Sequence, residues 1–209
     1  FVSLPPGIRR DRVQPADHLH RRTILRAELG ISEVTPMLLF VGSGFRTKGL
    51  DRALQALAGL PGDARLFVVG EDKAAPYQRQ ARRLGLEGRV HFMGGRDDVP
   101  AWLWAADLLV HPAYAENTGT VLLEAAIAGL PVLTTRACGY ADYIRDADLG
   151  RVLDDPTPES LAAAARELLA LDRPAWWEKA ARFAEQADIY SLTDHAVDAI
   201  EGEPPGAGQ

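Results

Sequence analysis

Short apolar runs alternate with longer amphipathic segments along most of the chain. A run such as MLLFV at positions 37–41 is apolar at successive positions, which is typical of a strand covered on both faces. The candidate strands begin 18 to 29 residues apart, so a helix and two turns fit between each pair. The pattern predicts six strands, at residues 37–41, 66–69, 89–93, 107–111, 131–135 and 151–153.

The segments between these strands have the periodicity of surface helices. The predicted helices cover residues 49–58, 77–84, 99–106 and 120–128. The last of them ends at Gly129-Leu130-Pro131, because Gly suits a left-handed cap and Pro cannot continue a helix. Strands that alternate with helices predict the α/β class, here an open parallel sheet of about six strands with helices on both faces.

The two ends of the chain differ from this alternation. Residues 1–36 contain the turn PPGI at 5–8 and then a polar-rich helix, so we expect a linker and a helix that lead into the first strand. The main domain is predicted to span residues 37–187. Beyond it we expect a closing helix over 188–201 and a disordered tail over 202–209.

Composition and charge narrow the class of protein. With 209 residues, 47% hydrophobic and 25% charged, the chain has a globular composition and not that of a disordered or fibrous protein. The net charge of -6 disfavours binding to nucleic acid, since a uniformly acidic body repels a phosphate backbone. One cysteine, Cys138, and no run of eighteen apolar residues favour a cytoplasmic protein. The chain opens with Phe1, and we expect it to be part of a longer protein.

Ligands of open parallel sheets bind beyond the carboxyl ends of the strands, where loops meet helix N-termini. The first such loop, GSGFRTKG, lacks the third glycine of a dinucleotide fingerprint and the Lys-hydroxyl pair of a Walker loop. Its two cations, Arg46 and Lys48, stand next to a helix start and suit a diphosphate held without a metal. The alternative is an ordinary turn with two solvated cations.

A second signal lies in the loop before the helix predicted at 120–128. Glu116 and Glu124 are separated by seven residues, so Glu116 falls in the loop and Glu124 inside the helix, roughly 7 Å beyond its mouth. A carboxylate accepts hydrogen bonds from both hydroxyls of a vicinal diol, so one Glu for each sugar of a nucleotide-sugar fits this spacing. The alternative is a pair of Glu side chains that only solvate the surface.

These residues carry a resemblance to a known family. The segment HPAYAENTGTVLLEAAIAGLPVLTT resembles the E-x7-E segment of family 4 retaining glycosyltransferases of the GT-B fold. Together with VGSGFRTKGLDRAL, LFVVGEDK, RVHFMGGRDDVP and CGYADYI, it is similar to the members of that family that add glucose to the lipopolysaccharide inner core. The similarity runs from PPGI to about residue 190. It implies the Rossmann-like C-terminal domain of a GT-B enzyme, which holds the donor.

The resemblance also implies residue roles. Glu124 is expected to bind the ribose of UDP, and Glu116 the hydroxyls of the donor hexose, with Glu116 and Lys48 taking part in catalysis. Lys48 is the main cation for the diphosphate, with Arg46 as a second positive charge, and Arg96 is expected near the uracil. Ser43 departs from the broader family, which commonly has Arg directly after the glycine that ends the first strand. The remaining expected donor-binding residues come from the start of the helix: Asn117, Thr118, Gly119, Thr120 and Val121.

The implied reaction is transfer of a hexose, expected to be glucose, from UDP-hexose to a heptose hydroxyl of the inner core, with retention of configuration. UDP-sugar is then a substrate, and neither a cofactor nor a metal is expected. The acceptor domain, and any contact with the inner face of the inner membrane, belong to an N-terminal half that this chain lacks. Two other readings stay open: a GT-B nucleotide-sugar epimerase and a non-enzymatic regulatory module.

Overall fold

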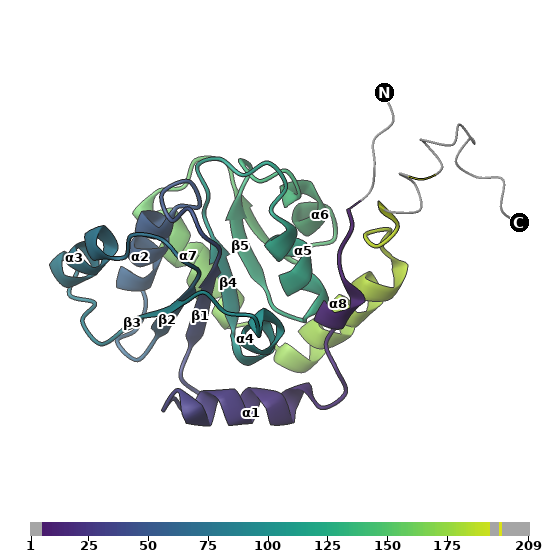
Figure 1. Ribbon diagram of the computed structural model, residues 1–209, viewed down its shortest axis with the longest axis horizontal. Helices are drawn as coiled ribbons and strands as arrows, with labels where there is room; N and C mark the ends of the chain where they lie inside the picture. Colours follow the sequence, from purple (N-terminus) through teal and green to yellow (C-terminus); the bar gives the residue numbers. More distant parts are fainter. Residues whose placement is uncertain (1–5, 193–196, 198–209) are drawn as a thin grey trace, which may run out of the picture.

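The computed structural model describes residues 6–192 and 197, and its centre is one parallel six-stranded sheet (Figure 1). The prediction of the α/β class and of about six strands is confirmed, with boundaries that differ from the predicted ones by at most one residue at each end. The strands are β1 (Met37–Val41), β2 (Arg65–Val69), β3 (Val90–Gly94), β4 (Leu108–His111), β5 (Val132–Thr135) and β6 (Gly150–Leu153).

Helices cover both faces of this sheet. Figure 1 shows α2 and α3 on one side and α5, α6 and α8 on the other. The α-helices are α1 (His18–Glu28), α2 (Leu50–Ala58), α3 (Ala75–Arg83), α4 (Val99–Ala105), α5 (Thr120–Ile127), α6 (Ala141–Asp146), α7 (Pro158–Leu169) and α8 (Arg173–Gln186). A short 3-10 helix, η1 (Arg10–Arg12), precedes α1.

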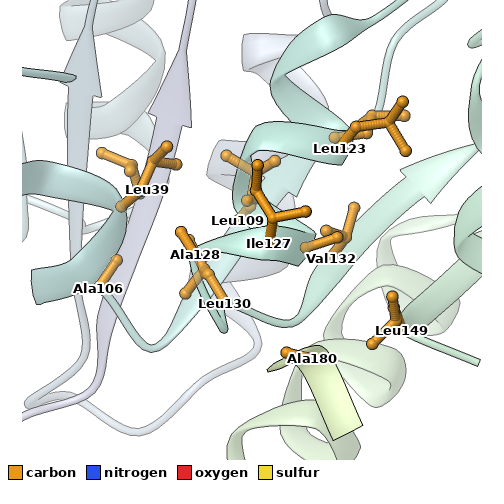
Figure 2. Close-up of a cluster of buried hydrophobic side chains, with 14 of the residues drawn as sticks. Leu39, Ala106, Leu109, Leu123, Ile127, Ala128, Leu130, Val132, Leu149 and Ala180 are labelled. Carbon is orange, nitrogen blue, oxygen red and sulfur yellow. The ribbon is translucent and has the colours of Figure 1, made fainter. Parts of the chain in front are cut away.

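Alternate residues of each strand enter one of two cores. Leu38 and Phe40 of β1 face the core beneath α2, α3 and α7. Leu39 of the same strand faces the core beneath α4, α5 and α8, where Leu109 and Val132 join it (Figure 2). A strand buried on both faces cannot alternate with polar residues, which explains the continuous apolar runs in the sequence.

The strand order, β3-β2-β1-β4-β5-β6, places the topological switch between β1 and β4. The chain leaves β1 toward one side of the sheet and leaves β4 toward the other, because α2 and α5 lie on opposite faces. The two loops therefore diverge and open a crevice at the carboxyl edge of the sheet, the place where doubly wound folds bind ligands. The sequence did not predict this order, since strand adjacency depends on contacts between distant segments.

The segment predicted as a linker and helix is bound to the domain. Arg22 and Arg26 of α1 are buried and reach Asp107, whose side chain is 2% exposed, at the start of β4. The Nη2 atom of Arg22 lies 2.6 Å from Oδ1 of Asp107, and Arg173 of α8 lies 2.5 Å from the same oxygen. One carboxylate thus joins both α1 and α8 to the sheet.

Part of the predicted C-terminal organisation lies outside the described residues. Most of the closing helix expected over 188–201, and all of the disordered tail expected over 202–209, lie outside the described residues. Among the helices within residues 6–192, none is long and apolar enough to cross a membrane.

Candidate functional site

The crevice is formed by the β1–α2 and β4–α5 loops, which are held to each other by backbone hydrogen bonds. The N–H of Tyr114 donates to the carbonyl of Thr47 over 2.8 Å, and the N–H of Ala115 donates to the same oxygen over 3.3 Å. These bonds lie one residue before Lys48 and one or two residues before Glu116. The two candidate side chains are therefore fixed relative to each other by the main chain.

The backbone of Glu116 is also clamped from the other side by the β5–α6 loop. Its N–H donates to the carbonyl of Ala137, and its carbonyl accepts from the N–H of Gly139, both over 3.1 Å. The hydroxyl of Thr135 donates to the carbonyl of Ala113 over 2.7 Å and ties the same two loops together. A loop bonded on both sides can hold a carboxylate in one place before any ligand arrives.

Helix α5 begins at this point with its N-terminus open to the crevice. Gly119 precedes it with a φ of +76°, a left-handed backbone conformation that residues other than glycine rarely adopt, and no side chain of the described residues caps the helix there. The first N–H groups of a helix have no partner within the helix and carry a partial positive charge. The mouth of α5 thus offers donors to an anion.

Lys48 and Glu116 form an ion pair in front of this mouth, with side chains 22% and 16% exposed. The Lys48 chain crosses directly over Gly42, because a Cβ atom at Gly42 would lie 2.8 Å from Cδ and Cε of Lys48. Glycine at the end of β1 therefore gives the lysine its path into the crevice. The pair presents one positive and one negative group to the same space.

Beneath this pair lies His111, the last residue of β4, which is fully buried. Its Nε2 atom is 3.7 Å from Oε2 of Glu116. Burial, and secondarily the positive charge of Lys48, lower the pKa of His111 to about 4 even though Glu116 opposes the shift. His111 is therefore neutral near pH 7, and the positive partner of the Glu116 carboxylate is Lys48.

Glu124 lies further along α5, on the wall of the same crevice, and meets a residue that the sequence did not predict. Nε of Arg12, in η1, is 3.6 Å from Oε1 of Glu124, and the Arg12 side chain is only 17% exposed. That Nε atom is buried and has no hydrogen-bond partner in the described part of the chain. No local pattern marked Arg12, because its contact depends on the packing of η1 against α5.

Two adjoining clefts make up the crevice. One of about 240 Å³ is lined by Arg12, Lys48, Glu116, Glu124 and the start of α5 from Thr118 to Val121. The other, of about 520 Å³, is lined by Ser43, Arg96 and the loops after β2 and β3. Val41, Gly42 and Val99 line both clefts, so the two are continuous.

The structure thus brings most of the predicted site residues to one crevice. Arg46 is an exception: it lines a separate pocket on the other side of the β1–α2 loop, with Asp51, Tyr77 and Tyr114. Asn117 does not line either cleft, and its carbonyl lies against Gly139, where a Cβ would be 2.0 Å from the oxygen. Arg96 is held by Asp98, which accepts from its Nε over 2.9 Å and its Nη2 over 2.7 Å.

The sequence also contains Asp146-Ala147-Asp148, which has the spacing of a metal-binding D-x-D motif and which we interpret as a chance match. Asp148 pairs with Lys179 and Arg151, far along the chain from the crevice loops. Within residues 6–192, no group of three or more His, Cys, Asp or Glu side chains is placed to hold a metal ion.

Doubly wound sheets with a switch-point crevice of this kind form a class of nucleotide-binding domains. A family model described as glycosyl transferases group 1 matches residues 21–189, and the chain belongs to this family.

Individual relatives agree with the family. The chain is 48% identical to lipopolysaccharide glucosyltransferase WaaG of Escherichia coli over 97% of its own length and 56% of the length of that protein. It is 32% identical to the lipopolysaccharide core biosynthesis glycosyltransferase LpsE of Rhizobium meliloti, covering 69% of this chain and 43% of LpsE. This chain therefore spans about half the length of these relatives.

Solved structures match the fold. A crystal structure of WaaG matches with a TM-score of 0.87 at 47% identity, over 95% of this chain and 56% of that one. The C-terminal domain of a group 1 glycosyl transferase from Francisella tularensis matches over 98% of its length and 91% of this chain, with a TM-score of 0.66 at 18% identity. This chain thus has the Rossmann-like fold of one half of a GT-B enzyme, and the identity to WaaG places it as the C-terminal half.

Proposed function

We propose that this chain is the donor-binding half of a retaining glycosyltransferase that moves a hexose, glucose in the first instance, from UDP-hexose to the lipopolysaccharide inner core. The observation that carries the proposal is the arrangement at the mouth of α5, where Lys48 and Glu116 stand before the open N–H groups and Glu124 lies deeper on the same helix. The 48% identity to WaaG supports the choice of reaction.

In this proposal the diphosphate binds between the N-terminus of α5 and Lys48. The N–H groups of Thr118 to Val121 donate to its oxygens, and Lys48 exchanges part of its contact with Glu116 for the phosphate. The ribose then reaches Glu124, whose carboxylate accepts from its hydroxyls while Arg12 holds the carboxylate from behind. The base occupies the adjoining cleft beside Ser43 and Arg96.

The donor hexose then lies near Glu116, in front of the helix. Its bond to the β-phosphate oxygen breaks as the acceptor hydroxyl forms the new bond on the same face of the sugar and passes its proton to the departing phosphate oxygen. Negative charge develops on the leaving UDP, where Lys48 and the α5 dipole stabilise it by about 3 kcal/mol. We assign no side chain as a general base, and this arrangement calls for no metal.

Most of the acceptor site, and the membrane contacts, belong in the proposal to the half of the relatives that this chain does not cover. The complete enzyme would act on the cytoplasmic face of the inner membrane. The chain by itself is expected to bind the donor and to transfer sugar poorly, because half of the active-site cleft is missing.

Isothermal titration of the chain with UDP and with UDP-glucose tests the proposal directly. Binding of both ligands, in competition with each other, is the expected result. Absence of heat and of competition at millimolar ligand would contradict a donor site. Titration with ADP is the matched control, since the diphosphate contacts are shared and only the base cleft can discriminate between the two nucleotides.

A further inference from the structure

A second pocket lies next to the proposed donor site, on the other side of the β1–α2 loop. It measures about 480 Å³ and is lined by side chains from three segments of the chain: Arg46, Thr47 and Asp51, then Tyr77, then Tyr114. Ligand sites in proteins typically range from about 300 to 1,000 Å³. The pocket is therefore large enough for a small organic ligand.

The aromatic walls of this pocket are fixed by contacts that do not involve a ligand. The guanidinium of Arg52 lies 3.6 Å from the centre of the Tyr114 ring, and the Tyr114 hydroxyl donates to Oδ2 of Asp51 over 2.7 Å. Tyr77 packs edge-on against the buried Phe45, with 5.7 Å between ring centres. Tyr114 nevertheless stays 50% exposed, so one rigid aromatic surface faces the solvent.

The charges of the pocket select among classes of ligand. Asp51 and the exposed Arg46 are of opposite sign and both line it. Asp51 repels a phosphate and Arg46 repels a cation, whereas a neutral ring with several hydroxyls can donate to the carboxylate and accept from the guanidinium. Tyrosine adds an apolar face with a polar tip, which suits the mixed surface of a sugar. The chemistry favours a neutral saccharide.

The pocket is joined mechanically to the proposed donor site. Thr47 lines the pocket, and its carbonyl accepts from Tyr114 and Ala115, while the residues that follow, Lys48 and Glu116, form the ion pair of the crevice. We infer that this pocket is a subsite for a neutral sugar ring of the acceptor saccharide, next to the ring that receives the hexose. The role of the ligand as acceptor rests on the proposed function, whereas the saccharide site itself does not.

Chemical-shift mapping tests the subsite. The ¹⁵N-labelled chain is titrated with methyl α-D-glucopyranoside and with maltose, and the expected shifts are confined to amides around residues 46–51, 77 and 114. Tyr77→Ala and Asp51→Asn are each expected to raise the dissociation constant for maltose at least about five-fold. Arg79→Ala is the matched control, because Arg79 is an exposed residue of α3 that does not line the pocket.

Other outcomes overturn the inference. The subsite would be excluded if the sugars shift none of these amides, or if Asp51→Asn shows the same shifts as wild type at each sugar concentration. Binding of inorganic phosphate in this pocket in place of the sugars would also exclude it. Asp51→Asn preserves side-chain volume, so it remains informative should Tyr77→Ala unfold. UDP titrated into the same samples separates the two proposals: UDP binding without sugar shifts rejects only the subsite, and sugar shifts without UDP binding reject only the donor site.

Discussion

Lys48 and Glu116 are 68 residues apart in the sequence and form an ion pair before the N-terminus of α5. Their backbones are brought together by the bonds between Thr47 and the two residues before Glu116. The pair lies in a crevice and is mostly shielded from solvent, so each charge has few other partners. A bound diphosphate competes with Glu116 for the ammonium group, and this competition makes the role of Lys48 measurable.

Replacing Lys48 by Ala is therefore expected to weaken UDP binding about 10- to 100-fold, since a charge-assisted hydrogen bond contributes about 1.5–3 kcal/mol. Lys48→Arg should recover part of the affinity. Calorimetric titration measures both constants. The control is Lys73→Ala, an exposed cation of the β2–α3 loop that does not line the two clefts. Equal affinity of Lys48→Ala and wild type for UDP would place the diphosphate elsewhere.

Substitutions of Glu124 and Glu116 are expected to affect the binding of UDP and of UDP-glucose differently. Glu124→Ala should weaken UDP and UDP-glucose by the same factor, about tenfold, because both ligands carry the ribose. Glu116→Ala should not weaken UDP, because it frees Lys48 for the diphosphate, and it should remove any gain that the glucose adds. Competition titrations with both ligands on both variants give the four constants. Losses of UDP affinity that match in the two variants would contradict the assignment of one carboxylate to each sugar.

Arg12 is expected to strengthen UDP binding indirectly, by holding the carboxylate of Glu124 in place. Its guanidinium lies 3.6 Å from the carboxylate, and its Nε has no hydrogen-bond partner within residues 6–192. Arg12→Ala should weaken UDP about fivefold, and Glu124→Ala should abolish that effect in the double variant, since coupled residues are not additive. Arg9→Ala is the control, because Arg9 is exposed in the same segment and pairs only with Asp11 among the described side chains. Full additivity of the two changes would show that Arg12 acts independently.

The sequence predicted the strands and the crevice loops well, because strand periodicity and the glycine-rich ends of strands are local signals. It could not predict on which side of the β1–α2 loop each cation lies. Arg46 and Lys48 are two residues apart, yet they face different pockets. It also missed Arg12, whose partner Glu124 is 112 residues further on (124 minus 12) and becomes a neighbour only when η1 packs on α5. Such information lies in the packing of distant segments and not in spacing.

The buried cluster around Asp107 is expected to determine much of the stability. Its carboxylate meets Arg22 and Arg173, and it also accepts from the N–H of Met37 over 2.7 Å. Asp107→Ala removes the buried counter-charge of Arg22 and Arg26 and leaves them only the half-exposed Glu33, which should lower the free energy of unfolding by about 3–5 kcal/mol. Urea denaturation measures the change. Asp155→Ala, exposed before α7, should shift it by less than about 0.5 kcal/mol, and a similar small shift at Asp107 would contradict the structural role.

His111 should make stability fall as the pH is lowered. Its pKa is about 4 in the folded protein, against an ordinary value of 6.5, because the ring is buried beneath Lys48 and Glu116. The unfolded chain therefore binds a proton between these values that the folded chain does not, so protonation favours unfolding.

Between pH 7 and pH 5 this difference should remove about 2 kcal/mol of unfolding free energy. That range lies above the ordinary carboxylate values, so titration of Asp and Glu contributes little to it. In His111→Gln the pH dependence over this range should be smaller by that amount, whereas exposed His20→Gln should retain it. Urea midpoints at pH 7, 6 and 5 give the three curves, and parallel curves for wild type and His111→Gln would show that the ring accepts its proton without unfolding.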